Sequence, residues 1–135
     1  MNLVERRNAT RQTMERFAGH PFAWGEYDCG TMVISHLRLF GYDEVIGPGG
    51  WSTAIGLQRW LIRHGGSGAA ALDGWIGARI DPARRIVGDI LEMPAALSLG
   101  AFGIAIGNGR VLAYYEGLEG AAIIQPVQFL TAWRP

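Results

Sequence analysis

The apolar residues of this chain follow a helical period up to about residue 80 and a strand period after residue 87. In the first part they recur every three to four residues, and glycine or proline follows most of the runs. We therefore expect helices over residues 4–17, 28–40, 52–62 and 69–80. Helices followed by strands are typical of an α+β domain, in which N-terminal helices pack on a C-terminal antiparallel sheet.

The second part of the chain predicts strands over residues 87–93, 102–106, 110–115 and 121–125. Asn108-Gly109 separates the second of these from the third, and this dipeptide is the strongest short-range signal for a two-residue hairpin. The glycine-rich stretch 47–50 predicts a loop between two helices. No linker, repeat or low-complexity tract divides the chain, so the sequence predicts one domain over residues 1–135.

The composition excludes several classes of function. Twelve basic and twelve acidic residues give a net charge of zero, which argues against a nucleic-acid partner. No apolar run approaches the roughly 20 residues of a membrane span, and residues 1–11 lack the apolar region of a secretory signal. We therefore expect synthesis in the cytoplasm. The single cysteine excludes an internal disulfide and a cysteine-based metal site, and we expect no cofactor.

Cys29 is the residue with the clearest chemical potential. Asp28 before it is a good N-cap, so Cys29 is predicted to lie in the first turn of a helix. The helix dipole there favours a thiolate and is expected to lower the pKa from roughly 8.5. Without its neighbours in the sequence, however, a lone cysteine is more typical of a buried apolar residue.

A thiol nucleophile needs a base, and the chain offers three histidines. His36 follows Cys29 by seven residues on the same predicted helix, about 10 Å along its axis, which is too far for a hydrogen bond. His64 is expected to cap the third helix. His20 is the best candidate, because the loop that carries it could fold back over the start of the cysteine helix.

Three segments resemble, in order, the motifs of NlpC-type cell-wall cysteine peptidases. Residues 19–25 followed by Asp28-Cys29-Gly30 resemble the "G-x-P-Y-x-W-G … D-C-S-G" motif of that family. Residues 88–91 resemble its "G-D-L-V" strand, and residues 102–109 its "H-V-G-I-Y-L-G-N-G" hairpin. The resemblance implies a papain-like fold with Cys29 at the nucleophile position and Asp28 as the helix N-cap. It also implies that the loop carrying Trp24 and Tyr27 walls a cleft, which makes them candidate binding residues.

The chain departs from these peptidases where their catalytic histidine stands. Aligning the hairpin motif puts Ala101 at that position, and the next strand offers Ala113 and Tyr114 where a polar residue normally orients the histidine. Proton transfer by such groups is typically worth about 10²–10⁴-fold in rate. The resemblance therefore implies a degenerate peptidase, for which His20 is the remaining candidate base.

The closest resemblance is to a small group of phage and prophage tail-region proteins, usually known only as a domain of unknown function. They share the short length, the Trp-Gly-x-x-Asp-Cys segment and a terminal Ala-Trp-Arg, here residues 132–134. This resemblance implies a structural or assembly protein of the tail tip or baseplate. Such a protein would be made in the bacterial host cytoplasm, bind other tail-tip, baseplate or hub proteins, and be incorporated into the virion.

Two other functions remain open at this point. An active cysteine amidase or endopeptidase would cleave peptidoglycan stem peptides during infection, with Cys29 as nucleophile. A binding module would hold a stem peptide or cell-wall fragment in the same cleft without cutting it. The absence of a histidine at residue 101 favours the tail assembly protein.

Overall fold

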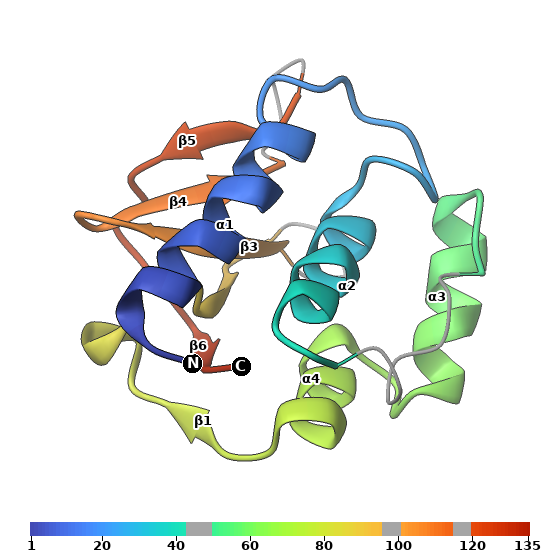
Figure 1. The fold of residues 1–135 in the computed structure, drawn as a ribbon. Coiled ribbons are helices and arrows are strands. Elements are labelled where there is room, and N and C mark those ends of the chain that lie inside the picture. The colour runs from blue at the N-terminus through green and yellow to red at the C-terminus, as the bar shows by residue number, and fades with distance from the viewer. Residues whose placement is uncertain (43–49, 96–100, 115–119) are drawn as a thin grey trace.

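A computed structural model of the chain describes residues 1–42, 50–95, 101–114 and 120–135 (Figure 1). The helices come first and the strands after them, so the predicted α+β class is confirmed. Six strands form one antiparallel sheet in the order β1-β6-β2-β3-β4-β5. The elements are α1 (Leu3–Phe17), α2 (Cys29–Leu39), α3 (Ala54–Arg63), α4 (Gly68–Ile76), β1 (Arg79–Ile80), the 3₁₀ turn η1 (Pro82–Arg84), β2 (Ile90–Met93), β3 (Ala101–Gly107), β4 (Arg110–Ala113), β5 (Ala122–Ile124) and β6 (Thr131–Trp133).

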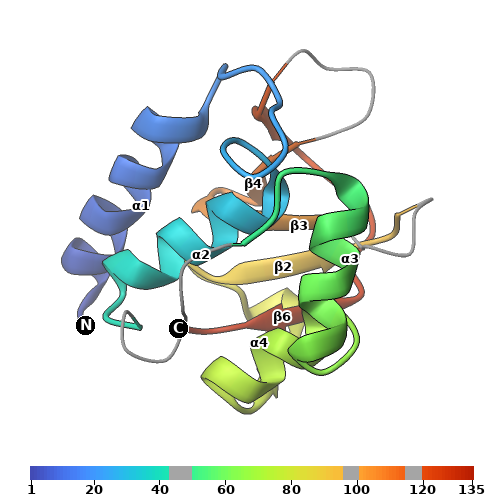
Figure 2. The same cartoon turned by 90° about the vertical axis from the view of Figure 1, so that its right-hand side faces the viewer.

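The helix α2 lies at the centre of the molecule, between α1 and the sheet strand β3 (Figure 2). The sheet face towards it carries large apolar side chains, because strand register brings Ile90, Ile104 and Leu112 side by side. The opposite face holds a second cluster of mainly small residues, against which Phe129 packs. Within the described residues, no helix has the length and apolar character needed to cross a bilayer.

The buried face of α1 differs from the apolar stripe that its sequence suggests. Val4 is 57% exposed, although its spacing from Met14 and Phe17 predicts a shared apolar face. The face that packs inward is instead partly polar, and its members are Arg6, Ala9, Thr10, Thr13 and Phe17. Buried polar groups of this kind need hydrogen-bond partners, which come from His36 of α2 and from Val87 and Asp89 in the turn before β2.

The hairpin of β3 and β4 is as predicted. Gly107 pairs with Arg110, and the two residues between them both have positive φ, 55° at Asn108 and 75° at Gly109. These angles suit the turn that matches the twist of the two strands. The predicted strand over 110–115 ends at Ala113 in the structure, and Tyr115 lies outside the described residues, as do residues 47–49 of the predicted loop.

Two short strands near the sheet's other edge were not predicted. The helix expected over residues 69–80 ends at Ile76, because Gly77 turns the chain with a φ of 99°. Arg79 and Ile80 then pair with the last strand, β6, as β1. β6 itself lies between β1 and β2, so the C-terminal segment is an interior strand of the sheet.

Both ends of the described chain are joined by an ionic cluster, formed by the buried Arg6 and Asp89 and the exposed Arg134. Arg6 Nη2 lies 2.7 Å from Asp89 Oδ1, and Arg134 Nη2 lies 2.9 Å from Asp89 Oδ2. Arg6 Nη1 also donates to the carbonyl oxygen of Pro135 at 2.8 Å. The Asp89 side chain is fully buried, and the backbone N–H of Ile86 donates to its Oδ2. This cluster ties α1, the turn before β2 and the segment after β6 together.

Candidate functional site

The loop before α2 closes into a tight turn that aims the chain at the helix start. Ala23 and Tyr27 exchange backbone hydrogen bonds of 3.0 and 2.8 Å. Gly25, inside the turn, has a φ of 81°, and a Cβ there would collide with the carbonyl oxygen of Trp51. Both its conformation and the close approach of Trp51 therefore require glycine at this position.

Asp28 is the N-cap of α2, as predicted, and its side chain is fully buried. Its carboxylate accepts three N–H groups: from the backbone of Thr31 at 2.8 Å, from the backbone of Gly25 at 2.7 Å, and from Trp51 Nε1 at 2.8 Å. These three donors satisfy both carboxylate oxygens. Asp28 therefore fixes the loop, the helix start and the segment before α3 to one another.

Cys29 is the first residue of α2 and lines a small cavity between α2, α3, α4 and the start of β3. The cavity measures about 40 Å³. Its other walls are almost entirely apolar and include three tryptophans; the lining side chains are Val33, Ile34, Trp51, Leu57, Trp60, Leu61, Ala71, Leu72, Trp75 and Phe102. Such surroundings disfavour a charge.

The structure overturns the expectation of a lowered thiol pKa. Burial of the Cys29 thiol, and secondly the nearby negative charge of Asp28, raise its pKa to about 11. Hydrogen bonding from the backbone, including that of Phe102, lowers it but does not offset these effects. At neutral pH the thiol is therefore protonated and is a weak nucleophile.

Each of the three histidines is held by structural contacts. His20 stacks on the ring of Tyr27 with centroids 3.3 Å apart, and its Nδ1 lies 3.1 Å from the carbonyl oxygen of Pro21. His64 caps α3, as predicted, by donating from Nδ1 to the carbonyl oxygen of Trp60. Within the described residues, no hydrogen bond joins any of these imidazoles to Cys29.

His36 lies on the other side of α2, in the core. Its Nε2 is 2.9 Å from the carbonyl oxygen of Gly88, so this nitrogen carries the proton, and Nδ1 accepts from the hydroxyl of Thr13 at 2.7 Å. Burial lowers its pKa to about 4. The predicted exclusion of His36 as a base for Cys29 agrees with this position.

The start of β3 faces the cysteine through Phe102. Ala101, which the sequence places at the histidine position, packs against the cluster on the opposite face of the sheet. Phe102, the next residue, lines the Cys29 cavity and packs closely on Gly68. Neither an alanine nor a phenylalanine side chain can transfer a proton, so this position supplies no base.

Tyr114 follows β4 on the same face as Phe102 and carries a buried hydroxyl without a hydrogen-bond partner within the described residues. Burial, with the charge of Asp28 second, raises the pKa of Tyr114 to about 12. A phenol with so high a pKa is not a base at neutral pH. The burial of Tyr114 is a tertiary effect, because its ring packs against the apolar core.

The two candidate binding residues of the loop have different surroundings. Trp24 is partly buried against the core, and the ring of Phe22 meets it edge-on with centroids 4.7 Å apart. Tyr27 is held between His20, which stacks on it, and Phe17, whose ring meets it edge-on at 5.6 Å. Trp51, which holds Asp28, was missed, because nothing in the local sequence links it to a residue 23 positions away.

The chain belongs to the family described as Domain of unknown function (DUF6950), which matches residues 1–135. A comparison with curated proteins finds no match.

Proposed function

We propose that this protein is a structural or assembly component of a phage or prophage tail, in the tail-tip or baseplate region. In this proposal it has a papain-like, NlpC-type fold that no longer catalyses peptide hydrolysis and instead binds neighbouring tail or hub proteins. The observation that carries the loss of activity is the state of Cys29, whose thiol has a raised pKa in an apolar cavity without an imidazole.

The proton transfers that peptide hydrolysis requires support the proposed loss of activity. Acylation needs a thiolate and then a donor for the leaving amine. Cys29 is protonated at neutral pH, and the nearest strand positions hold Ala101 and Phe102. These positions therefore offer no group to deprotonate the thiol and none to protonate the leaving amine.

Residues of the motifs that resemble the peptidases also make structural contacts. Asp28 fixes the loop, Asp89 holds two arginines, and Trp133 donates from Nε1 to Asp73 at 2.9 Å. These contacts would preserve the motifs in a protein that keeps the fold without the chemistry. The tail assignment itself rests on the resemblance of the short chain and its terminal Ala-Trp-Arg.

The first test is alkylation of Cys29 by iodoacetamide as a function of pH, in the folded protein and in the protein unfolded in urea. A rise of the thiol pKa from 9.0 to about 11 leaves about 100-fold less thiolate near pH 8. We expect the folded thiol to react slower than the unfolded one by at least that factor. Equal or faster reaction of the folded protein would contradict the loss of activity.

The second test separates assembly from catalysis. Purified peptidoglycan should release no muropeptide with either the wild type or Cys29→Ser, whereas pull-downs of the neighbouring tail-tip and hub proteins should succeed with both. Release that Cys29→Ser abolishes would establish the alternative, an active cysteine amidase or endopeptidase. A correctly folded protein that captures none of these tail proteins would refute the assembly role.

A further inference from the structure

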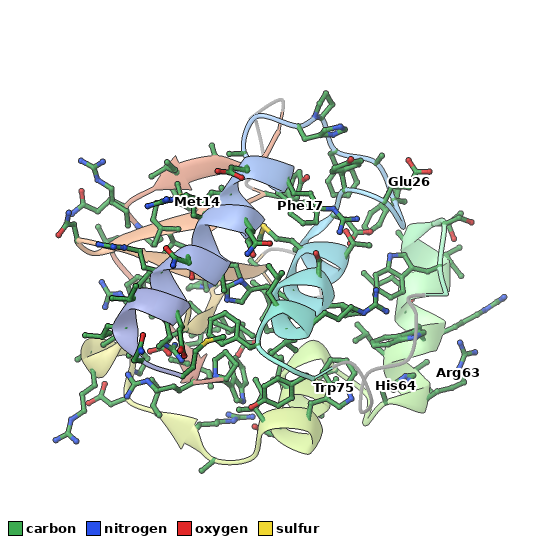
Figure 3. The ribbon with its side chains drawn as sticks, viewed as in Figure 1. Met14, Phe17, Glu26, Arg63, His64 and Trp75 are labelled. Carbon is green, nitrogen blue, oxygen red and sulfur yellow. The ribbon has the colours of Figure 1, made fainter. Side chains whose placement is uncertain are left out.

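A polar groove of about 450 Å³ lies beside the cysteine loop, next to the Cys29 cavity, and Ile34 of α2 lines both. It is lined by the last turn of α1, the loop residues 25–27 and the outer face of α2. Phe17 and Glu26 lie on either side of the N-terminal end of α2 in the view of Figure 3. Unlike the Cys29 cavity, this groove contains charged side chains.

Arg16 is a fixed cation in this groove. Its Nη1 donates to the hydroxyl oxygen of Ser35 at 3.0 Å, and its guanidinium lies over the ring of Phe17, 5.2 Å from the centroid. These two contacts hold the side chain, so less conformational entropy is lost when it binds an anion. A guanidinium retains further N–H donors after giving one to Ser35.

Arg38 adds a second cation on the same face, because it follows Ser35 by three residues on α2. Both arginines are exposed, and neither forms an ion pair with another residue of the described ranges. Two guanidinium groups that flank one hydroxyl suit a carboxylate, which accepts several N–H donors at once.

Tyr27 supplies a rigid aromatic wall to the same groove. His20 stacks on one side of its ring, and Phe17 meets it edge-on, so the ring cannot turn freely. Glu26, beside Tyr27 in the loop, gives the lining of the groove a negative charge as well. An extended peptide could place a carboxylate at the arginines and backbone or cationic N–H groups towards Glu26.

From this arrangement we infer that the groove binds a carboxylate-bearing peptide segment of a partner protein. Arg16 and Arg38 contact the carboxylate, and the Tyr27 ring packs against the segment beside it. The inference deepens the proposed assembly function and rests on it, since it names the surface and the chemistry of the partner. It assigns Tyr27, which does not line the Cys29 cavity, a binding role in this groove.

The test uses an acetylated, amidated tetra-glutamate peptide as probe. Its binding is measured from the NMR chemical shifts of the backbone and the arginine side chains of the full chain. We expect saturable shifts at Arg16, Ser35 and Arg38, and a roughly three- to tenfold weaker affinity in Arg16→Gln and Arg38→Gln. Arg63→Gln is the matched control, because Arg63 is exposed at the end of α3, outside the groove (Figure 3). The tetra-glutamine peptide controls for charge.

Three outcomes would overturn the inference: no saturable shifts with tetra-glutamate, equal weakening in Arg63→Gln, or equal shifts with tetra-glutamine. Inorganic phosphate binding in place of the peptide would overturn the carboxylate assignment. These failures are distinct from failure of the proposed function. If the protein captures tail proteins and releases no muropeptides, but tetra-glutamate does not bind at the groove, only the peptide-binding inference is refuted. Muropeptide release that depends on Cys29 would instead refute the assembly proposal, whatever the groove binds.

Discussion

At Cys29 two opposing effects act on the thiol, and their magnitudes decide its state. A helix N-terminus stabilises a negative charge by typically 0.3–1 kcal/mol at an exposed position. The pKa rise from 9.0 to about 11 corresponds to roughly 3 kcal/mol against the thiolate. The cavity therefore outweighs the helix terminus, and the first turn of α2 presents a neutral thiol.

Tyr114 provides a prediction at the scale of one atom. Its buried hydroxyl has no partner within the described residues, and an unmade buried hydrogen bond typically costs about 1–3 kcal/mol. Tyr114→Phe removes that group, so we expect urea unfolding to show unchanged stability or a gain of about 1 kcal/mol. Thr13→Val, which removes a hydroxyl bonded to His36, should destabilise instead. A loss in Tyr114→Phe as large as in Thr13→Val would show that the hydroxyl has a partner.

For Asp28 we expect a loss of stability, in contrast to Tyr114, because both oxygens of its carboxylate accept hydrogen bonds. Asp28→Asn replaces one acceptor oxygen with an NH₂ group that faces N–H donors from Gly25, Thr31 or Trp51. We expect a loss of about 2–4 kcal/mol in the free energy of unfolding. Asp81→Asn is the matched control, since Asp81 is an exposed cap of η1. Similar losses in the two variants would contradict the role of Asp28 as a buried junction.

At the scale of elements, His36 joins α1, α2 and the turn before β2, and its titration should loosen that packing. Its folded-state pKa of about 4 lies below the ordinary 6.5, so the unfolded chain binds the proton more readily. The stability that neutral His36 contributes is therefore complete above about pH 6.5 and is lost as the pH falls towards 4. The loss amounts to about 3 kcal/mol.

Urea unfolding between pH 7 and pH 4 measures this dependence. His36→Gln keeps a donor for the carbonyl of Gly88 and does not titrate, so its stability should change less over the same range. An unchanged slope in His36→Gln would assign the acid sensitivity to other groups.

The elements that the sequence predicts well are those fixed by local chemistry. Asp28 and Gly41 bound α2, and the turn at Asn108-Gly109 sets the register of β3 and β4. β1 and β6 escape prediction, because their few residues show no strand period in the sequence and they form by pairing with each other and, for β6, with β2. The inward face of α1 escapes for a related reason: Arg6 and Thr13 are buried by partners distant in sequence.

In the candidate site too, the features set by adjacent residues were predicted, whereas those that depend on the packing of the whole molecule were not. The cap by Asp28 and the position of Cys29 on the helix follow from adjacent residues and were predicted. The raised thiol pKa depends on a cavity built from three helices and a strand, which no local pattern reveals. The sequence therefore predicted the position of Cys29 correctly, but the predicted direction of its pKa shift was wrong.

The ionic cluster of Arg6, Asp89 and Arg134 yields a prediction for the molecule as a whole. Asp89→Asn leaves two arginines, one of them fully enclosed, without their counter-charge, and breaking such a buried pair typically costs about 3–5 kcal/mol. We expect a cooperative loss of stability of that size in urea unfolding. Arg79→Gln, which breaks the exposed pair with Asp73, should cost far less, because solvent screens that pair. Equal effects would mean that Asp89 does not hold the ends together.

The hydrogen bond from Arg6 to Pro135 brings the two ends of the described chain to one corner of the molecule. A pull applied between residues 1 and 135 would therefore load the Arg6–Asp89–Arg134 cluster first, and only afterwards the strands that lie behind it. A tether at both ends would peel α1 and the segment after β6 away one contact at a time. Anchorage through a side of the domain would instead spread the load over the sheet, so the direction of attachment decides how much mechanical force this fold withstands.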